Sequence, residues 1–356
     1  MNPGWRLCSV GTTAINPSSH CFLHVVLHML FASAYFRAAI LRDNGSPQLH
    51  PHNGRFSGPL TRLLVALQAG QGENELSQQL TAFKTVLPDR YSGSRPQDAA
   101  EFIMYLLDAV DTELRGSAAV AGVASDEIMA SSDLSWGRHF SGSSSMLGTA
   151  MCCQLRADRK CHLRLCYGVS IGHDHPMCLQ LALTDCSSIE QCLDRYFATV
   201  TDYSTDVEQC RLANRHPGRA VPTGADISTS ITRYPRILLL VLKRYRQTET
   251  GERVKDMRSV RASVNISLQR FHYTGTADGS QYKLAACCSH SGSGVHGGHY
   301  IATVLVPSTD ASAADQWIHM NDATATVDPT QGLIRNVPTQ AGFNVAVLLY
   351  EQCQPL

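Results

Sequence analysis

The hydrophobic period of the chain changes from helical to strand-like after roughly its first third. Near the amino end, apolar residues recur at the i, i+3, i+4, i+7, i+8 spacing of a helix packed on one face, at Phe22, Val25, Val26, Met29 and Leu30. A second helical pattern covers residues 60–67. A third begins at about Pro96, where Ser94 and Gln97 have the spacing of a capping box. The first third is therefore predicted to be predominantly helical.

Strand patterns dominate the later part of the chain. Residues 116–148 are rich in Ala, Ser and Gly, and we interpret them as a flexible connection or a poorly packed insert. The run from Ile237 to Leu242 is fully apolar and suits a strand buried on both faces. Further strands are predicted at residues 282–288, 300–306, 316–320 and 345–350. Helices followed by an antiparallel sheet body predict the α+β class.

The charge of the chain is balanced, with 30 Lys plus Arg and 30 Asp plus Glu. No global field then recruits nucleic acid or a membrane surface, so we expect neither as a partner. The longest apolar stretch, Cys21 to Phe36, is too short and too polar to span a bilayer. The amino terminus lacks the basic region and apolar run of a secretory signal. We expect a monomer in the cytoplasm or the nucleus.

Thirteen cysteines, an odd number with adjacent pairs at 152–153 and 287–288, do not resemble a disulfide framework in a chain of this size. We expect reduced thiols. Three roles remain open for them: small buried apolar side chains, metal ligands, or one activated nucleophile.

Cys21 is the candidate nucleophile because it falls in the first turn of the first predicted helix. A helix amino terminus and a neighbouring imidazolium both favour the thiolate, which is the form that attacks carbonyls. The alternative is one more buried cysteine. Asn16 lies five residues upstream on an irregular segment, where its amide can donate to a developing oxyanion, although an Asn before a Pro is also an ordinary turn former.

His299 is the candidate base, because it ends a glycine-rich loop that starts at His290 and then enters a predicted strand. The alternative is a flexible loop whose histidines are incidental. Asn321 and Asp322 end the next predicted strand, and either side chain can orient an imidazole by accepting its N–H. Strand alternation points the two to opposite faces, so only one is expected to hold the base directly.

Five segments resemble, in order, the sequence boxes of the ubiquitin-specific proteases. Residues 16–22 resemble the cysteine box, 95–102 the Gln-Asp-Ala-x-Glu-Phe helix, and 234–245 the proline-led central strand. Gly298 to Tyr300, with Trp317 and 321–322, resembles the histidine box, and 347–351 the closing strand. The resemblance covers about residues 10–352, and five boxes in the correct order are highly specific.

The resemblance implies a papain-like fold shaped like a hand. A single catalytic domain at 10–352 would follow an amino-terminal extension at 1–9. Within it the helical thumb would cover about 10–135, the β-sheet fingers about 136–235, and the antiparallel β palm about 236–352. Catalysis would take place where thumb and palm meet.

The resemblance also assigns catalytic roles. Cys21 would be the nucleophile, His299 the general base and then acid, and Asn321 the orienting residue. Asn16 would be the oxyanion donor, and Asp322 would support or replace Asn321.

Four further residues would bind the substrate. Asp98 and Glu101 fall where the family meets the basic tail of ubiquitin. Gly298 and Tyr300 fall where the glycine-lined loop would pinch the end of that tail, so that only a substrate ending in two glycines would thread the slot.

Metal binding is the less favoured interpretation of two groups of residues. Many family members clamp the fingers with four cysteines around zinc, but here only Cys161, Cys166 and Cys210 match, and His216 or His162 would have to complete a tetrahedral site. We expect no bound zinc and no cofactor. His20, His24 and His28 share one helix face, which could bind a metal; we favour a polar face that lines the cleft or meets neighbouring loops.

The resemblance implies a cysteine deubiquitinase that hydrolyses the isopeptide or peptide bond after the carboxyl-terminal glycine of ubiquitin, through a thioester. Two alternatives stay open. One is a catalytically weak ubiquitin-binding scaffold, because Ser18-Ser19-His20 departs from the Gly-Asn-Thr common in the family, and His24 and His28 replace residues usually seen as Asn and Gln. The other is a protease for a different ubiquitin-like modifier.

Overall fold

The structure is a computed structural model. It describes residues 20–45, 54–115, 131–140, 145–162, 169–203, 224–275, 278–292, 294, 297–308, 314–322, 324–328, 336 and 340–353. Asn16, Cys166 and Cys210 lie outside these residues, as does His216.

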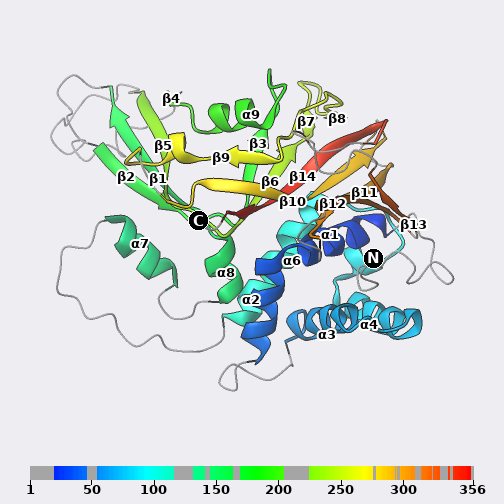
Figure 1. Cartoon of the computed structure of the whole chain (residues 1–356). Helices are drawn as coiled ribbons and strands as arrows, with labels where there is room; N and C mark the ends of the chain where they lie inside the picture. The colour runs from blue at the N-terminus through cyan, green and yellow to red at the C-terminus, as the bar shows by residue number, and fades with distance from the viewer. Residues whose placement is uncertain are drawn as a thin grey trace.

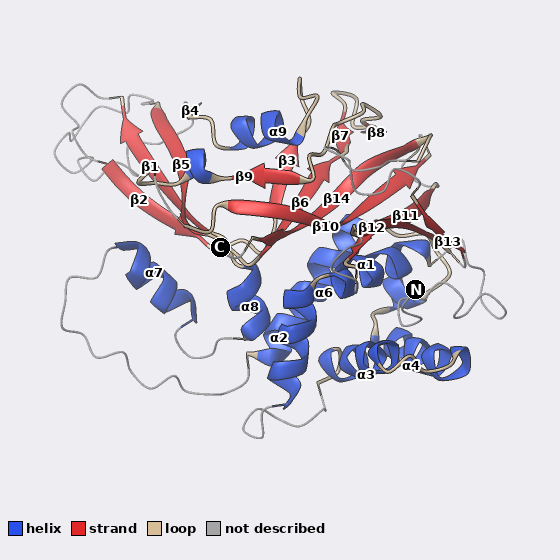
Figure 2. Ribbon diagram, in the orientation of Figure 1, coloured by secondary structure: helices blue, strands red, loops and turns tan. Residues whose placement is uncertain are grey.

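Helices build the part of the chain that precedes the first strand (Figures 1 and 2). They are α1 (Cys21–Ala32), α2 (Ala34–Gly45), α3 (Ser57–Gln68), α4 (Glu73–Val86), α5 (Asp89–Ser92), α6 (Ala99–Leu114), α7 (Ser131–Phe140) and α8 (Met146–Met151). The predicted helices after Phe22 and around residues 60–67 are confirmed.

Residues 116–148 were predicted to be a flexible connection or a poorly packed insert, and within them the structure describes 131–140 and 145–148, where α7 and the start of α8 lie. A flexible connection is wrong there, whereas α7 buries only Phe140 and so agrees with a poorly packed insert. Trp136 and Phe140 contact each other at 4.7 Å between ring centroids, and Leu147 and Met151 are buried in the core. These few apolar residues among Ala, Ser and Gly give too weak a period to be recognised in the sequence. Helices therefore continue to Met151, past the thumb boundary expected at 135.

Two larger sheets follow the helices. A four-stranded sheet has the order β2-β1-β5-β4, from β1 (Gln154–Cys161), β2 (Val169–Asp174), β4 (Val200–Asp202) and β5 (Ala225–Arg233). The eight-stranded sheet has the order β13-β12-β11-β10-β14-β6-β3, with β9 paired to β10. Its strands are β3 (Leu179–Ala182), β6 (Ile237–Lys243), β9 (Asn265–Ser267), β10 (Gln281–Ser291), β11 (His299–Val306), β12 (Gln316–Asn321), β13 (Thr324–Val327) and β14 (Phe343–Gln352).

All the strands predicted after residue 236 are confirmed. The large sheet is antiparallel except that β3 runs parallel to β6, so a strand from the expected fingers range belongs to the same sheet as the strands expected in the palm. Helix α9 (Ile189–Tyr196) packs beside β3, and a small hairpin of β7 (Tyr245–Gln247) and β8 (Arg253–Lys255) follows β6. A 3₁₀ turn covers Gln269–Phe271.

Two apolar cores lie on opposite faces of the large sheet, and β6 contributes to both. Ile237, Leu239 and Val241 join the core formed with the helices, while the alternate residues Leu238, Leu240 and Leu242 join the core under α9. The predicted burial of both faces is therefore confirmed, because side chains alternate along a strand. Figure 1 shows α1 on one side of this sheet and α9 on the other.

Helix α1 is almost wholly buried, and it packs against β10 and β11. Within the described residues, no helix alone has the length and apolarity to cross a membrane. Helices α1 and α2 together have the length and composition of a membrane-spanning segment, but they meet at a 90° bend.

Helix α6 begins at Ala99, and its N-cap is Asp98 rather than Ser94. The Asp98 Oδ1 atom accepts hydrogen bonds from the backbone N–H of Ala100 at 2.7 Å and of Glu101 at 3.0 Å. The predicted start at about Pro96 is wrong, because the Asp98 side chain satisfies two amides that the helix leaves without partners.

We predict that Asp98→Ala lowers the free energy of unfolding by about 1 kcal/mol, because those two amides lose their acceptor. Asp98→Asn keeps a capping oxygen and is expected to cost only a few tenths of that. Urea denaturation of the two variants measures the difference. Equal losses would mean that the charge of Asp98, and not its capping hydrogen bonds, stabilises α6.

Candidate active site

Cys21 is the first residue of α1 and only 4% exposed. Because α1 packs against β11, the amino end of the helix lies beside the first residue of that strand, His299. The imidazole of His299 makes a side-chain hydrogen bond with Cys21, which is the main reason that its pKa rises. The fold thus brings together two residues from opposite ends of the chain.

Asn321 holds the other side of the His299 ring. Strands β11 and β12 are antiparallel neighbours, so the last residue of β12 lies beside the start of β11. The Asn321 Oδ1 atom is 2.7 Å from His299 Nε2, which leaves Nδ1 as the ring nitrogen for Cys21. The hydrogen bond with Cys21, followed by that with Asn321 and the charge of Asp322, raises the pKa of His299 to about 9 despite burial, which opposes the rise.

Asp322 also approaches the imidazole, so the expectation that Asn321 and Asp322 point to opposite faces is wrong. Its Oδ2 atom is 3.6 Å from His299 Nε2. The reason is that Asp322 has left the strand: its φ is +47°, in the left-handed region, and alternation no longer applies. At that distance Asp322 contributes charge, while Asn321 makes the short hydrogen bond.

A second Cys–His contact in the chain has different electrostatics. The Cys152 Sγ atom is 3.9 Å from His139 Nε2. Burial raises the pKa of Cys152 to about 12, and burial followed by the charge of Arg115 lowers the pKa of His139. Both shifts keep the proton on sulfur. Burial also raises the pKa of Cys287 to about 12 and that of Cys288 well above its usual range, so these cysteines are buried thiols. None of the ten described cysteines is in a disulfide.

A cleft opens beside Cys21. It is lined by Cys21, Arg95, Pro96, Gln97, Asp98, Glu101, Tyr245, Arg253, His290, Gly297, Gly298 and Tyr300. Asp98, Glu101, Gly298 and Tyr300, expected to bind substrate, thus all reach the same cleft as Cys21. Arg95 and Arg253 line it as well, so its charge is mixed rather than purely acidic.

Asp98 and Tyr300 are joined within the cleft. The Tyr300 hydroxyl lies 3.5 Å from Asp98 Oδ2, and burial raises the pKa of the phenol far above its usual range. Asp98 therefore caps α6 with one oxygen and lies within reach of the β11 residue Tyr300 with the other. Glu101, in the first turn of α6, is exposed and is the carboxylate available to a cationic ligand.

The three histidines of α1 do not line the cleft as expected. His20 and His28 are buried, and burial lowers the pKa of His28 to about 4. Burial, followed by the charge of Lys84, lowers the pKa of His24 to about 3. The lowered pKa values keep His24 and His28 neutral. The described residues contain no group of three His, Cys, Asp or Glu side chains placed to hold a metal.

Of the zinc candidates in the fingers, only Cys161 is described. It ends β1, and the next residue, His162, is hydrogen-bonded to Asp226, with 2.9 Å between Nε2 and Oδ1. His162 is therefore engaged by a carboxylate. Cys166 and Cys210 lie outside the described residues, and the absence of zinc stays a prediction.

The sequence did not indicate Lys255 or the role of His290. These two side chains are in contact at the cleft wall, which His290 lines, although they are far apart in the sequence. The glycine-rich loop drew attention to its last histidine, and no local pattern marks Lys255, because its partner is fixed only by the pairing of β10 and the position of β8.

Comparison with known proteins places these features in a family. The family model "Ubiquitin carboxyl-terminal hydrolase" matches residues 12–350. The ubiquitin carboxyl-terminal hydrolase Usp2 of Drosophila melanogaster is 21% identical over 312 residues, which are 86% of this chain and 32% of that protein. The ubiquitin carboxyl-terminal hydrolase 12 of Salmo salar is 24% identical over 318 residues, which are 86% of this chain and 79% of that protein. The chain thus spans about a third of the length of the Drosophila relative.

Solved structures share the fold. The SAGA DUB module of Ubp8, Sgf11, Sus1 and Sgf73 bound to monoubiquitin matches with a TM-score of 0.72 and 18% identity, over 99% of this chain and 71% of that one. The Ubp8/Sgf11/Sus1/Sgf73 module bound to ubiquitin aldehyde matches with a TM-score of 0.69 and 18% identity, over 99% and 70%. The α+β fold implied by the sequence boxes is confirmed. With its family model matched over nearly the whole chain, this protein belongs to the ubiquitin carboxyl-terminal hydrolase family.

Proposed function

We propose that this chain is a cysteine deubiquitinase, which hydrolyses the isopeptide or peptide bond after the carboxyl-terminal glycine of ubiquitin. The observation that carries the proposal is the hydrogen-bonded row of Cys21, His299 and Asn321 at the edge of a cleft. Ubiquitin bound to the two structural neighbours supports the choice of partner.

The first step is the attack of the Cys21 sulfur on the carbonyl carbon of the terminal glycine. His299 Nδ1 takes the thiol proton, and the raised pKa of His299 favours keeping it as imidazolium. Asn321 Oδ1 accepts from His299 Nε2–H and so fixes both the tautomer and the plane of the ring. The backbone N–H of Cys21, at the amino end of α1, is a donor for the developing oxyanion; Asn16 is proposed as a second donor.

The next step is the departure of the lysine amine. The imidazolium of His299 donates its proton to the amine nitrogen as the carbon–nitrogen bond breaks, which leaves a thioester on Cys21. A water molecule, deprotonated by the now neutral His299, attacks the thioester carbon and releases the carboxylate and the Cys21 thiol. Protons balance over the cycle, and no cofactor is required.

Glycines at the end of the tail fit the cleft wall beside Cys21. A Cβ at Gly298 would collide with His290 Nε2 and with the backbone oxygen of Ser291, so the wall itself is close-packed. Glu101 is exposed at the cleft and suits a basic residue further back along the tail.

We predict that ubiquitin carrying a thiol-reactive group at its carboxyl end forms one covalent adduct with the protein, which Cys21→Ala abolishes. Intact-mass spectrometry measures the adduct, and Cys152→Ala is the matched control because its sulfur also contacts a histidine. The control should retain the adduct. Ubiquitin binding without an adduct would favour the catalytically weak scaffold. An adduct only with another ubiquitin-like modifier would favour a protease for that modifier.

We predict that turnover of an isopeptide substrate falls as the pH rises through about 9, where His299 loses the proton needed by the leaving amine. The sign follows from the raised pKa: the imidazolium is present below about 9 and absent above it. Alkylation of Cys21 by iodoacetamide needs no acid, so its rate should not fall over the same range. A parallel fall in both rates would contradict this role of His299.

We predict that Asn321→Ala lowers kcat on the order of 10- to 100-fold and moves the alkaline limb to lower pH, because the hydrogen bond that orients His299 and raises its pKa is lost. Asp322→Ala removes only the longer charge contact and should cost several-fold at most. Steady-state kinetics across pH compares the two variants. An equal or larger loss in Asp322→Ala would make Asp322 the orienting residue.

A further inference from the structure

Lys255 is the last residue of β8, and its ammonium group is buried. None of the described hydrogen-bond partners of this ammonium group is a carboxylate. Lys255 is only 5% exposed. The Nζ atom lies 2.6 Å from His290 Nδ1 and donates to the backbone oxygens of Gly292 at 2.6 Å and His290 at 3.4 Å. Burial, followed by the charge of Arg244, lowers the pKa of Lys255 to about 8. A buried cation that is hydrogen-bonded only to neutral acceptors is costly.

The contact fixes the state of the His290 ring. An ammonium group can only donate, so His290 Nδ1 must be the acceptor and the ring proton must be on Nε2. Burial and then the charges of Lys255, His299 and Arg244 lower the pKa of His290 to about 4. His290 therefore stays neutral, with an N–H at Nε2. The ring of Tyr300 covers it at 4.3 Å between centroids.

The Nε2 atom of His290 points at the backbone of Gly298. A Cβ built there would collide with this nitrogen, and Gly298 has a φ of +148°, which favours glycine. His290, Gly298 and Cys21 line one cleft. The N–H thus lies beside the glycine that precedes the candidate base His299.

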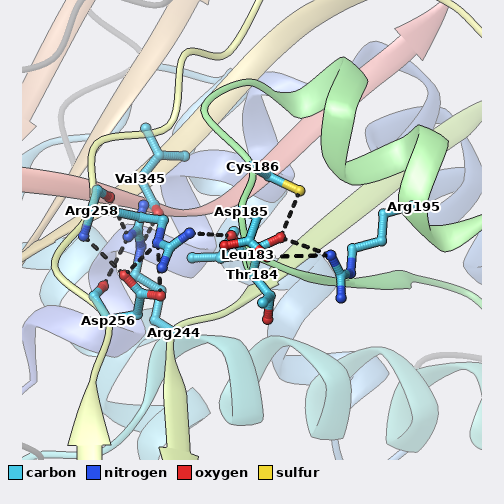
Figure 3. Close-up of polar contacts among 9 residues, drawn as sticks. All are labelled: Leu183, Thr184, Asp185, Cys186, Arg195, Arg244, Asp256, Arg258 and Val345. Carbon is cyan, nitrogen blue, oxygen red and sulfur yellow. Dashed lines mark hydrogen bonds and ion pairs between the residues drawn. The ribbon is translucent and has the colours of Figure 1, made fainter.

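Arg244, shown in Figure 3, fixes the chain directly after Lys255. Its guanidinium donates to the backbone oxygens of Asp256 at 3.0 Å, Arg258 at 2.8 Å and Val345 at 2.6 Å. The backbone N–H of Asp256 in turn donates to the Arg244 oxygen at 2.6 Å. The residue directly after Lys255 is therefore held to β14, and the ammonium has little freedom to leave His290.

We propose that Lys255 is a positioning residue that fixes His290 as an N–H donor to a main-chain carbonyl in the glycine end of the substrate tail. This inference rests on the proposed function, since it needs a tail in the cleft. Lys255 also ties down Gly292, at the start of the loop that ends at His299. A main-chain carbonyl suits this donor because glycines offer no side chain to recognise.

A double-mutant cycle tests the inference. Isothermal titration calorimetry compares the binding of intact ubiquitin with that of ubiquitin lacking its last two glycines, for the wild type and for each variant. His290→Phe keeps a ring but loses the donor, and Lys255→Met keeps the stem but loses the charge. Each should reduce the preference for intact ubiquitin about 3- to 10-fold, the value of one hydrogen bond. His290→Gln retains an N–H near the place of Nε2 and should retain most of the preference.

The control is Lys283→Met, a Lys to Met change on the neighbouring β10 surface, where Lys283 pairs with Asp315 outside the cleft. It should leave the preference unchanged. Variants that weaken binding of both ubiquitins equally would show a purely structural role and overturn the inference.

Nitrogen-15 NMR of the histidine rings supplies a second measurement that does not depend on the folding of any variant. We expect the Nε2–H tautomer for His290 in the wild type; the Nδ1–H tautomer would overturn the inference. A wild type that neither binds ubiquitin nor forms the adduct would instead refute the proposed function, so the two failures are distinguishable.

Discussion

The packing of α1 against β11 is the contact on which the site depends. Cys21 and His299 have no local means of meeting, because one begins the first described helix and the other follows the last glycine-rich loop. They meet because the apolar face of α1 and the inner face of the large sheet share one core. The packing of this core therefore determines how precisely the site residues are placed. The apolar side chains that set the catalytic geometry take no part in the chemistry.

Two neighbouring imidazoles, His299 and His290, have pKa values shifted in opposite directions, and their hydrogen-bond partners explain why. His299 has Cys21, Asn321 and Asp322 around it, which together favour the charged ring and raise its pKa to about 9. His290 is more deeply buried and faces the ammonium of Lys255, which disfavours the charged ring and lowers its pKa to about 4. One ring is thus suited to exchange a proton, and the other to stay neutral. Two titratable groups in one site can take separate roles when their surroundings move their pKa values apart.

The hydrophobic period of the sequence predicted the helices and strands. The positions of individual side chains around the site depend on contacts that this period does not encode. The helix after Phe22 and the strand from Ile237 were predictable because each has a continuous apolar pattern. The start of α6 was misplaced because Asp98 competes with Ser94 as a cap. Asp322 was misplaced because its left-handed φ ends the alternation one residue early. His24 and His28 were expected to line the cleft or to meet neighbouring loops, because a row of histidines indicates a polar helix face. Neutral imidazoles, however, can be buried among apolar side chains.

The contrast between Cys21 and Cys152 shows why a cysteine next to a histidine is not in itself a nucleophile. His139 lies beside Arg115, whose charge opposes a second positive charge on the ring, and the Cys152 thiol is buried. Proton transfer from sulfur to imidazole would there create an ion pair beside a cation and away from water. At Cys21 the acceptor ring is stabilised from behind by an amide oxygen and a carboxylate, and a helix amino terminus faces the sulfur. Asn321, the third residue of the row, favours the charged form of the His299 ring. This distinguishes a site for acyl transfer from a buried contact between a cysteine and a histidine.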